Sequence, residues 1–199
     1  MDKTETASIA EAAYFNQLAA SWDGIRELNE KKLKMLVEML GVRQADAVLD
    51  LGSGTGVLLP YLSPLAGTVT ALDFASEMLA KARTKFAGLN NVSYVVADIL
   101  AYESQQRFDK ITCMNFFPHI RDKERFIKRV NVLLKPEGEI TIFHDISRQK
   151  VNAIHGSSKH VENDRLKAAE IEAAPFLAAG FTCKKVLDND EYYFLQLKK

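Results

Sequence analysis

Cysteine is scarce in this 199-residue chain, which contains only Cys113 and Cys183 and no C-x-x-C motif. A disulfide framework needs more cysteines than this, and cysteine-based zinc or iron–sulfur binding has no support. Both cysteines stand in apolar runs, over residues 111–117 and 181–187. We therefore expect two buried free thiols.

An excess of charge of either sign is also missing, because 26 Lys and Arg residues balance 26 Asp and Glu residues. A nucleic-acid-binding protein usually carries a basic excess or a basic stripe, so a nucleic-acid partner is not expected. No apolar run approaches the roughly 18 residues of a membrane span, and residues 1–11 lack the pattern of a signal peptide. We expect a cytoplasmic monomer or homodimer.

The length suits one domain with a substantial core, and we expect a single domain over residues 1–199. Short apolar runs typical of buried strands alternate with longer helical patterns, which predicts a parallel sheet with helices on both faces. The predicted strands cover residues 47–51, 68–72, 92–97, 108–114, 139–144, 181–187 and 192–197. The fold class is α/β, a Rossmann-like doubly wound sheet of seven strands, mostly parallel with an antiparallel strand from the C-terminal hairpin.

Helical patterns fill most of the intervals between these strands, at residues 28–40, 57–65, 75–86, 121–134 and 166–179. Ser76 is the expected N-cap of the third helix. Pro175 lies inside the last one, which predicts a kink or a late start. Two polar segments, residues 1–27 and 145–165, stand outside the scheme, and such segments often carry specificity.

The strongest functional signal follows the first predicted strand, where residues 48–56 read Val-Leu-Asp-Leu-Gly-Ser-Gly-Thr-Gly. Glycines allow a sharp turn and a close approach of the backbone to a ligand. The helix start beyond the turn offers backbone N–H groups to a carboxylate or phosphate. The dinucleotide fingerprint G-x-G-x-x-G/A fails here, because its sixth position is Val57.

The turn instead has the pattern D-x-G-x-G-x-G, which resembles motif I of class I S-adenosylmethionine-dependent methyltransferases. In that family the turn holds the amino-acid end of S-adenosylmethionine, and the resemblance implies that Asp50 meets its ammonium group. The turn residues expected to contact this cofactor are Gly52, Ser53, Gly54, Thr55 and Gly56.

Two more acids follow the next two predicted strands. Asp73 can accept the ribose hydroxyls of this cofactor, but it would serve NAD equally well. The resemblance places Asp98 near the adenine amino group, although an Asp in this position can also be a simple helix cap. The side chains expected to sandwich the adenine are Phe74, Met78 and Ile99.

The resemblance covers roughly residues 12–199 and is to the small ubiquinone/menaquinone-biosynthesis-like group. It extends to the fourth-strand region at residues 108–109 and 115–119, to the passage before strand five at 129–139, and to the N-terminal segment that covers the cofactor. Tyr14 and Trp22 lie in that segment and are expected to close over the cofactor. A helix packed on the core would explain the same two residues.

Methyl transfer is an in-line displacement with a neutral leaving group, so the enzyme must align the acceptor and exclude water. A base helps when the acceptor is a hydroxyl or a thiol. After the fourth strand, Asn115 and Phe116 are candidates to contact the cofactor and Phe117 to bind the acceptor. His119 is the first candidate base. An Asn/Asp-Pro-Pro-Tyr motif is absent, which disfavours methylation of DNA amines.

His144 closes the fifth predicted strand and is the second candidate for catalysis. The residues expected to bind the acceptor are Phe117, His119, His144, Asp145, Asn152 and His155. Imidazoles and carboxylates also suit Zn, Fe or Ni, but the histidine spacing, His160 included, matches no standard metal motif, and no metal is expected.

The sequence therefore predicts methyl transfer from S-adenosylmethionine to a small-molecule acceptor, with S-adenosylhomocysteine as the product. Two alternatives stay open. One is a sensor that binds S-adenosylmethionine without transferring its methyl group, and the less favoured one is an NAD-dependent Rossmann oxidoreductase. None of the motifs identifies the acceptor or the methylated atom.

Overall fold

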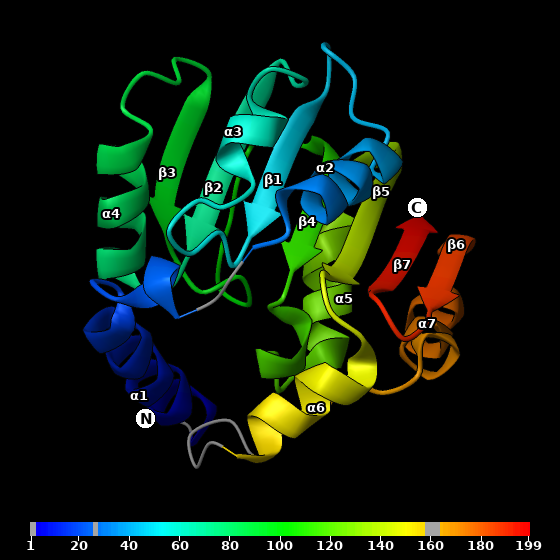
Figure 1. The fold of residues 1–199 in the computed structure, drawn as a ribbon. Coiled ribbons are helices and arrows are strands. Elements are labelled where there is room, and N and C mark those ends of the chain that lie inside the picture. Colours follow the sequence, from blue (N-terminus) through cyan, green and yellow to red (C-terminus); the bar gives the residue numbers. More distant parts are fainter. Residues whose placement is uncertain (1–2, 26–27, 158–163) are drawn as a thin grey trace. The chain divides into compact units, whose positions relative to one another are not determined.

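A computed structural model describes residues 3–25, 28–157 and 164–199 (Figure 1). The chain divides into two compact units, residues 1–103 and 104–199, which are described separately. The expected single domain over residues 1–199 stays a prediction. None of the described helices is both long and apolar enough to cross a membrane.

The first unit contains three parallel strands in the order β3-β2-β1. These are β1 (Ala47–Leu51), β2 (Thr68–Asp73) and β3 (Val92–Val96). Leu51 is in register with Leu72, so β1 and β2 end together. Both strands are buried over nearly their full length, as expected for strands of a parallel sheet covered on both faces.

The helices of the first unit are α1 (Lys3–Leu18), the short 3-10 helix η1 (Trp22–Gly24), α2 (Glu30–Met39), α3 (Leu59–Leu62) and α4 (Ser76–Lys85). The predicted cap at Ser76 is wrong, because Ala75 occupies the N-cap position and its side chain cannot accept a hydrogen bond. Two other side chains bind the first N–H groups of α4. Asp73 Oδ1 accepts from Ala75 N at 2.8 Å, and Asn16 Oδ1 accepts from Glu77 N at 2.9 Å.

The second unit contains four strands in the order β4-β5-β7-β6. They are β4 (Phe108–Met114), β5 (Leu134–His144), β6 (Thr182–Asp188) and β7 (Tyr193–Lys198). β4 and β5 are parallel, whereas β7 is antiparallel to both β5 and β6, as the predicted hairpin requires. β5 begins five residues before its predicted start.

The helices of the second unit are the 3-10 helix η2 (Phe117–His119), α5 (Lys123–Leu133), α6 (Arg148–Gly156) and α7 (Ala169–Ala178). α7 starts later than predicted and contains Pro175. Cys113 is buried as expected, but Cys183 is exposed on the edge strand β6, so the prediction of two buried thiols is wrong for that residue. The first four residues of β6, Cys183 among them, are exposed.

Candidate functional site

The glycine-rich turn directly follows β1, and its backbone conformation explains its glycines. Gly52, Gly54 and Gly56 have φ angles of +65°, +55° and +84°, a region that strains other residues. A Cβ added at Gly56 would lie 2.8 Å from Leu59 Cδ1, so this glycine is also required by packing. The nearest atom to a Cβ added at Gly54 is Trp22 Nε1 at 3.9 Å. Gly54, unlike Gly56, therefore has room beside its backbone.

Asp73 links the end of β2 to this turn. Its Oδ2 accepts a hydrogen bond from Gly54 N at 2.8 Å, while its Oδ1 binds the start of α4. The residue is only 6% exposed. A carboxylate has roughly four acceptor positions, so these two bonds alone do not exhaust its capacity for a ribose hydroxyl. The sequence did not predict this role in holding the turn.

Ser53 carries the clearest sign that the turn is built for a ligand. Its hydroxyl is buried and has no hydrogen-bond partner among the residues that the structure describes. A buried unsatisfied hydroxyl costs about 1–3 kcal/mol. A polar ligand group in the turn would remove this cost, which fits the carboxylate or ammonium end of S-adenosylmethionine.

The other two predicted acids differ in their surroundings. Asp50 is buried within β1, just before the turn. Asp98 lies two residues beyond the end of β3, and its Oδ1 accepts from Leu100 N at 2.8 Å, which stabilises the turn there. Ile99, between Asp98 and Leu100, is only 3% exposed. No helix lies between β3 and β4, whose connecting residues are all described, so the alternative of a helix cap at Asp98 is wrong and its carboxylate caps a turn instead.

A cluster of apolar side chains fastens the N-terminal segment to α4. Phe15 contacts the rings of Tyr14, Trp22 and Phe74 at centroid distances of 5.4, 5.6 and 5.9 Å. Phe15, Leu18 and Trp22 also pack on the buried group of Ala19, Ala75 and Met78. The structure therefore brings together Tyr14, Trp22, Phe74 and Met78, which the sequence predicted. Phe15, at the centre, was missed as a contact residue.

Polar contacts join the same segment to the glycine-rich turn. Thr55 Oγ1 donates to Asp23 Oδ1 at 2.5 Å, and Lys85 and Lys81 lie 2.9 and 3.2 Å from Asp23 Oδ2. We call Asp23, Thr55, Lys81 and Lys85 the Asp23 clasp. Burial opposes ionisation of Asp23, but the hydrogen bonds from Thr55, Lys85 and Lys81 outweigh it and hold its pKa below the usual value.

Asn115 directly follows β4 in the second unit and has an unusual backbone conformation. Its φ is +54°, which Asn tolerates better than most residues and which is often found at functional sites. Its N–H donates to Phe143 O at 2.9 Å, and its Nδ2 donates to Asp145 Oδ1 at 3.0 Å. The structure thus brings together two predicted site residues, Asn115 and Asp145.

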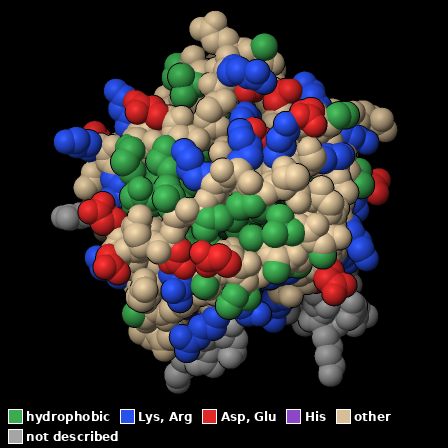
Figure 2. Space-filling model, turned by 90° about the vertical axis from the view of Figure 1, so that its right-hand side faces the viewer, with side chains coloured by type: hydrophobic (Ala, Val, Ile, Leu, Met, Phe, Trp, Pro, Cys, Tyr) green, Lys and Arg blue, Asp and Glu red, His purple; other side chains and the backbone are tan. Residues whose placement is uncertain are grey.

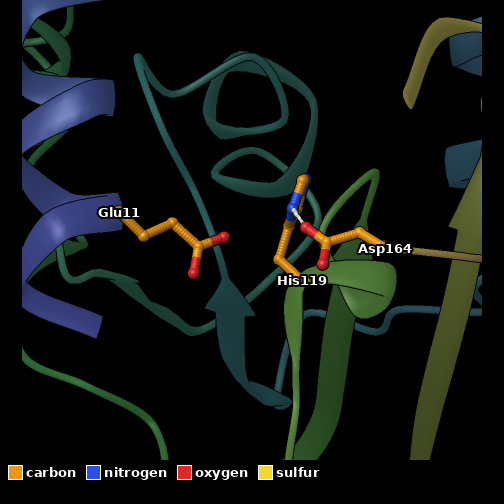
Figure 3. Close-up of side chains that lie close together, drawn as sticks. All are labelled: Glu11, His119 and Asp164. Carbon is orange, nitrogen blue, oxygen red and sulfur yellow. Dashed lines mark hydrogen bonds and ion pairs between the residues drawn. The ribbon is translucent and has the colours of Figure 1, made fainter. Parts of the chain in front are cut away.

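His119 pairs with a residue that the sequence analysis did not identify. Its Nδ1 lies 2.7 Å from Asp164 Oδ2, and both side chains are 10% exposed (Figure 3). The His155 ring lies 5.1 Å from the His119 ring, centroid to centroid, and His155 Nδ1 lies 2.5 Å from the Asp164 carbonyl oxygen. Burial lowers the pKa of His155 below its usual value. No local pattern marks Asp164, which is 45 residues from His119.

The remaining predicted residues of the second unit have other contacts. His144 is buried and meets Tyr193 edge to face at 5.9 Å. Asn152 binds both backbone groups of Leu166. Phe117 is fully buried, with its ring 5.7 Å from that of Phe126, which is the environment of a core residue.

Phe116 is the last residue of the predicted set, and His160 was considered only as a metal ligand. The Phe116 ring lies 6.4 Å from the His119 ring. His160 lies outside the described residues.

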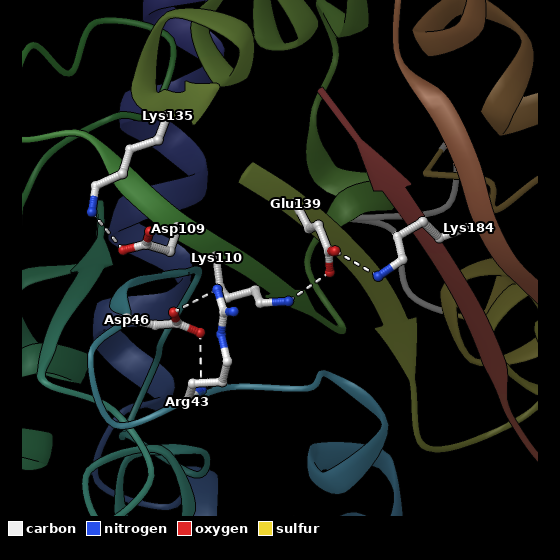
Figure 4. Close-up of polar contacts among 7 residues, drawn as sticks. All are labelled: Arg43, Asp46, Asp109, Lys110, Lys135, Glu139 and Lys184. Atoms are coloured by element: carbon white, nitrogen blue, oxygen red, sulfur yellow. Dashed lines mark hydrogen bonds and ion pairs between the residues drawn. The ribbon is translucent and has the colours of Figure 1, made fainter. Parts of the chain in front are cut away.

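Charged pairs elsewhere in the units serve the fold. In the first unit, Asp46 Oδ2 accepts from Arg43 N at 2.9 Å. In the second, Glu139 lies 2.6 Å from both Lys110 and Lys184 (Figure 4). Burial works against ionisation of Glu139, but these two lysines outweigh it and hold its pKa below the usual value. On the face shown in Figure 2, basic and acidic side chains are interspersed, in keeping with the balanced composition.

Comparisons with known proteins agree with the geometry of the turn. A family model described as "Methyltransferase domain" matches residues 48–138. The ubiquinone biosynthesis O-methyltransferase of Paracidovorax citrulli (strain AAC00-1) is 32% identical over 158 residues, which cover 73% of this chain and 66% of that protein. The chain belongs to the class I S-adenosylmethionine-dependent methyltransferases.

A second methyltransferase of the same description, from Coxiella burnetii (strain Dugway 5J108-111), is 31% identical over 147 residues, 69% of this chain and 62% of its own length. The chain thus spans less than two thirds of the length of these curated methyltransferases. Among solved structures, a complex of DhpI with SAH matches with a TM-score of 0.77 and 22% identity, covering 96% of this chain and 95% of the other. This match confirms the predicted methyltransferase fold class of seven strands, mostly parallel with an antiparallel C-terminal strand.

Proposed function

We propose that this protein transfers a methyl group from S-adenosylmethionine to a small-molecule acceptor by in-line displacement and releases S-adenosylhomocysteine. The observation that carries the proposal is the glycine-rich turn after β1. Its three positive-φ glycines, its bond to Asp73 and the buried, unsatisfied hydroxyl of Ser53 suit a polar ligand. Membership of the methyltransferase family makes S-adenosylmethionine the ligand we propose.

In this proposal the first unit supplies most of the cofactor contacts. Ser53 and the backbone of the turn bind the amino-acid end, Asp50 lies by its ammonium group, and Asp73 accepts the ribose hydroxyls. The adenine lies beside Asp98 and the neighbouring apolar side chains. The full set that we propose is Tyr14, Trp22, Asp50, Gly52, Ser53, Gly54, Thr55, Gly56, Asp73, Phe74, Met78, Asp98, Ile99, Asn115 and Phe116.

The second unit supplies the groups that act on the acceptor. His119 is the base that we propose for an acceptor hydroxyl, because Asp164 fixes its Nδ1. The naming of the relatives as O-methyltransferases supports an oxygen acceptor. We retain His144 as a second catalytic candidate. The residues that we propose as candidates to bind the acceptor are Phe117, His119, His144, Asp145, Asn152 and His155.

Release of S-adenosylhomocysteine tests this proposal. The protein is incubated with S-adenosylmethionine and a panel of phenols, catechols, thiols and amines, and the product is measured by mass spectrometry. We expect release that depends on an acceptor, with matching methylation of it. Tight binding of S-adenosylmethionine without turnover of any acceptor would instead favour the sensor.

Three further expectations complete the proposal. We infer a cytoplasmic location, a monomer or homodimer, and no nucleic-acid substrate. The balanced charge of the chain supports the last of these. Light scattering of the purified protein measures its oligomeric state, and a methylation assay with DNA and RNA tests the excluded substrates.

A further inference from the structure

We propose that Asp164 is a positioning residue for His119, and that α6 holds Asp164 in place through Asn152 and His155. Asn152 and His155 would then influence the reaction through His119, without touching the acceptor. This inference rests on the proposed function, because it assigns roles to residues around the proposed base. It replaces the acceptor-binding role predicted for Asn152 and His155.

The first step of the argument is the pair of His119 and Asp164. An ionised carboxylate only accepts hydrogen bonds, so at 2.7 Å the Nδ1 atom of His119 carries the hydrogen. In the neutral ring the basic lone pair is then on Nε2. Both side chains are 10% exposed, so water screens their interaction weakly. Asp164 therefore selects one tautomer of His119 and favours the imidazolium formed when Nε2 takes a proton.

The second step is how Asp164 itself is held. Asn152 Nδ2 donates to Leu166 O at 2.9 Å, and Leu166 N donates to Asn152 Oδ1 at 2.9 Å. His155 Nδ1 lies 2.5 Å from the carbonyl oxygen of Asp164. These three bonds run from α6 to the backbone of residues 164–166. They use both functional groups of the Asn152 amide, which is the arrangement of a structural bridge.

The third step is the packing of His155 against His119. The two rings are tilted by 39° with centroids 5.1 Å apart. Because burial lowers the pKa of His155, this ring is neutral at pH 7 and does not repel the imidazolium of His119. α6 begins at the N-cap Ser147, whose side chain accepts from Lys150 N, so the helix has a defined start beside β5.

His119 acts as the base while the methyl group is transferred to the acceptor. As the acceptor oxygen forms its bond to the methyl carbon, the carbon–sulfur bond breaks and its electron pair returns to sulfur, which becomes a neutral thioether. His119 Nε2 takes the proton of the acceptor hydroxyl and later releases it to water. The Asp164 carboxylate, 2.7 Å from Nδ1, stabilises the imidazolium.

The test is the tautomer of His119, which requires no acceptor. Two-bond ¹H–¹⁵N spectra of the full-length protein labelled at histidine report which ring nitrogen carries the hydrogen, and His119→Gln assigns the signal. We expect Nδ1–H in the wild type and a shift towards Nε2–H in Asp164→Asn. Asn152→Ala should give a mixture, whereas Asp190→Asn, in an exposed turn, should leave the spectrum unchanged. An Nε2–H tautomer in the wild type would overturn the inference.

Turnover of catechol provides the second readout. We expect Asp164→Asn to lower kcat about 100-fold with an unchanged Kd for S-adenosylmethionine, and Asp164→Glu, which keeps the charge, to recover part of the rate. Asn152→Ala should add little to Asp164→Asn, because both act through one contact. A folded Asp164→Asn protein with the kcat of the wild type would contradict the inference. A wild-type protein that is inactive on every acceptor would contradict the proposed function. In that case the tautomer of His119 would still decide the inference.

Discussion

The glycine-rich turn and the His119–Asp164 pair are held in place by different kinds of interaction. The turn depends on backbone conformation, with three glycines at positive φ and a hydrogen bond from Gly54 N to the Asp73 carboxylate. The histidine pair depends on side chains joined across 45 residues and on bonds from a neighbouring helix. Changes in the turn should therefore affect stability and cofactor binding together, whereas changes around His119 should affect the rate and leave cofactor binding intact.

The largest expected effect is on the rate, from His119→Ala. Loss of a general base typically lowers turnover by about 100-fold or more. The Kd for S-adenosylmethionine, measured by calorimetry, should stay within about twofold of the wild type. A Kd that weakens in parallel with the rate would break the distinction between the two regions.

A large effect on stability is expected from Gly56→Ala. The new Cβ would lie 2.8, 3.0 and 3.1 Å from atoms of Leu59, Phe86 and Ala82, at a φ of +84°. Overpacking together with backbone strain should lower the free energy of unfolding by about 3 kcal/mol. Urea denaturation measures this loss. Gly88→Ala is the matched control, since a Cβ there meets no atom within 4 Å, and a similar loss in both variants would refute the packing explanation.

A smaller effect is expected from Asn16→Ala, which removes the side chain that accepts from Glu77 N at the start of α4. Loss of such a cap costs about 1 kcal/mol. The same denaturation experiment measures it, with Asn90→Ala as the control, because Asn90 is exposed and its side chain has no hydrogen bond to the described residues. No change in the free energy of unfolding would show that the N-terminal segment does not stabilise α4.

The smallest effect concerns the Asp23 clasp and pH. The folded pKa of Asp23 is below its ordinary value of 3.8. Stabilisation by the clasp is therefore complete well above that value and is lost as the pH falls through the folded pKa. The stability difference between the wild type and Asp23→Asn should shrink on acidification below about pH 5. A difference that grows on acidification would show that the pKa is raised.

Local patterns predicted the strands of the sheet more reliably than the segments that connect them. β1 and β4 have the predicted bounds, and both are short strands that are almost entirely buried. β5 was predicted too short, over residues 139–144, and its observed start at Leu134 lies before Pro136 and Gly138, two residues that are unfavourable in strands. In the structure Leu134 is in register with Phe108, and an irregularity with Glu137 at a φ of +66° accommodates the residues between. α6 was missed because Val151 is its one buried residue, so it shows no apolar periodicity.

The candidate site also contains one part that local sequence patterns predicted and one part that they did not. The residues of the turn are neighbours in the sequence, and its glycines are required by positive φ angles. A local pattern was therefore enough to predict the turn. Asp164 is defined only by its partner His119 far along the chain, and nothing in the residues around it indicates that contact. Asp73 was predicted as a ligand residue, but its bond to Gly54 depends on the distance between two strand ends.

Calorimetric titration of the wild type and Gly54→Ala with S-adenosylmethionine and NADH tests the central claim most directly. Gly54 is chosen because an added Cβ has room beside Trp22, so the variant should fold while the strained turn binds poorly. We predict that the wild type binds S-adenosylmethionine and not NADH, and that Gly54→Ala weakens this binding by about tenfold or more, since 1.4 kcal/mol of strain suffices. Binding of NADH alone, or equal binding of S-adenosylmethionine by a folded Gly54→Ala protein, would contradict the account.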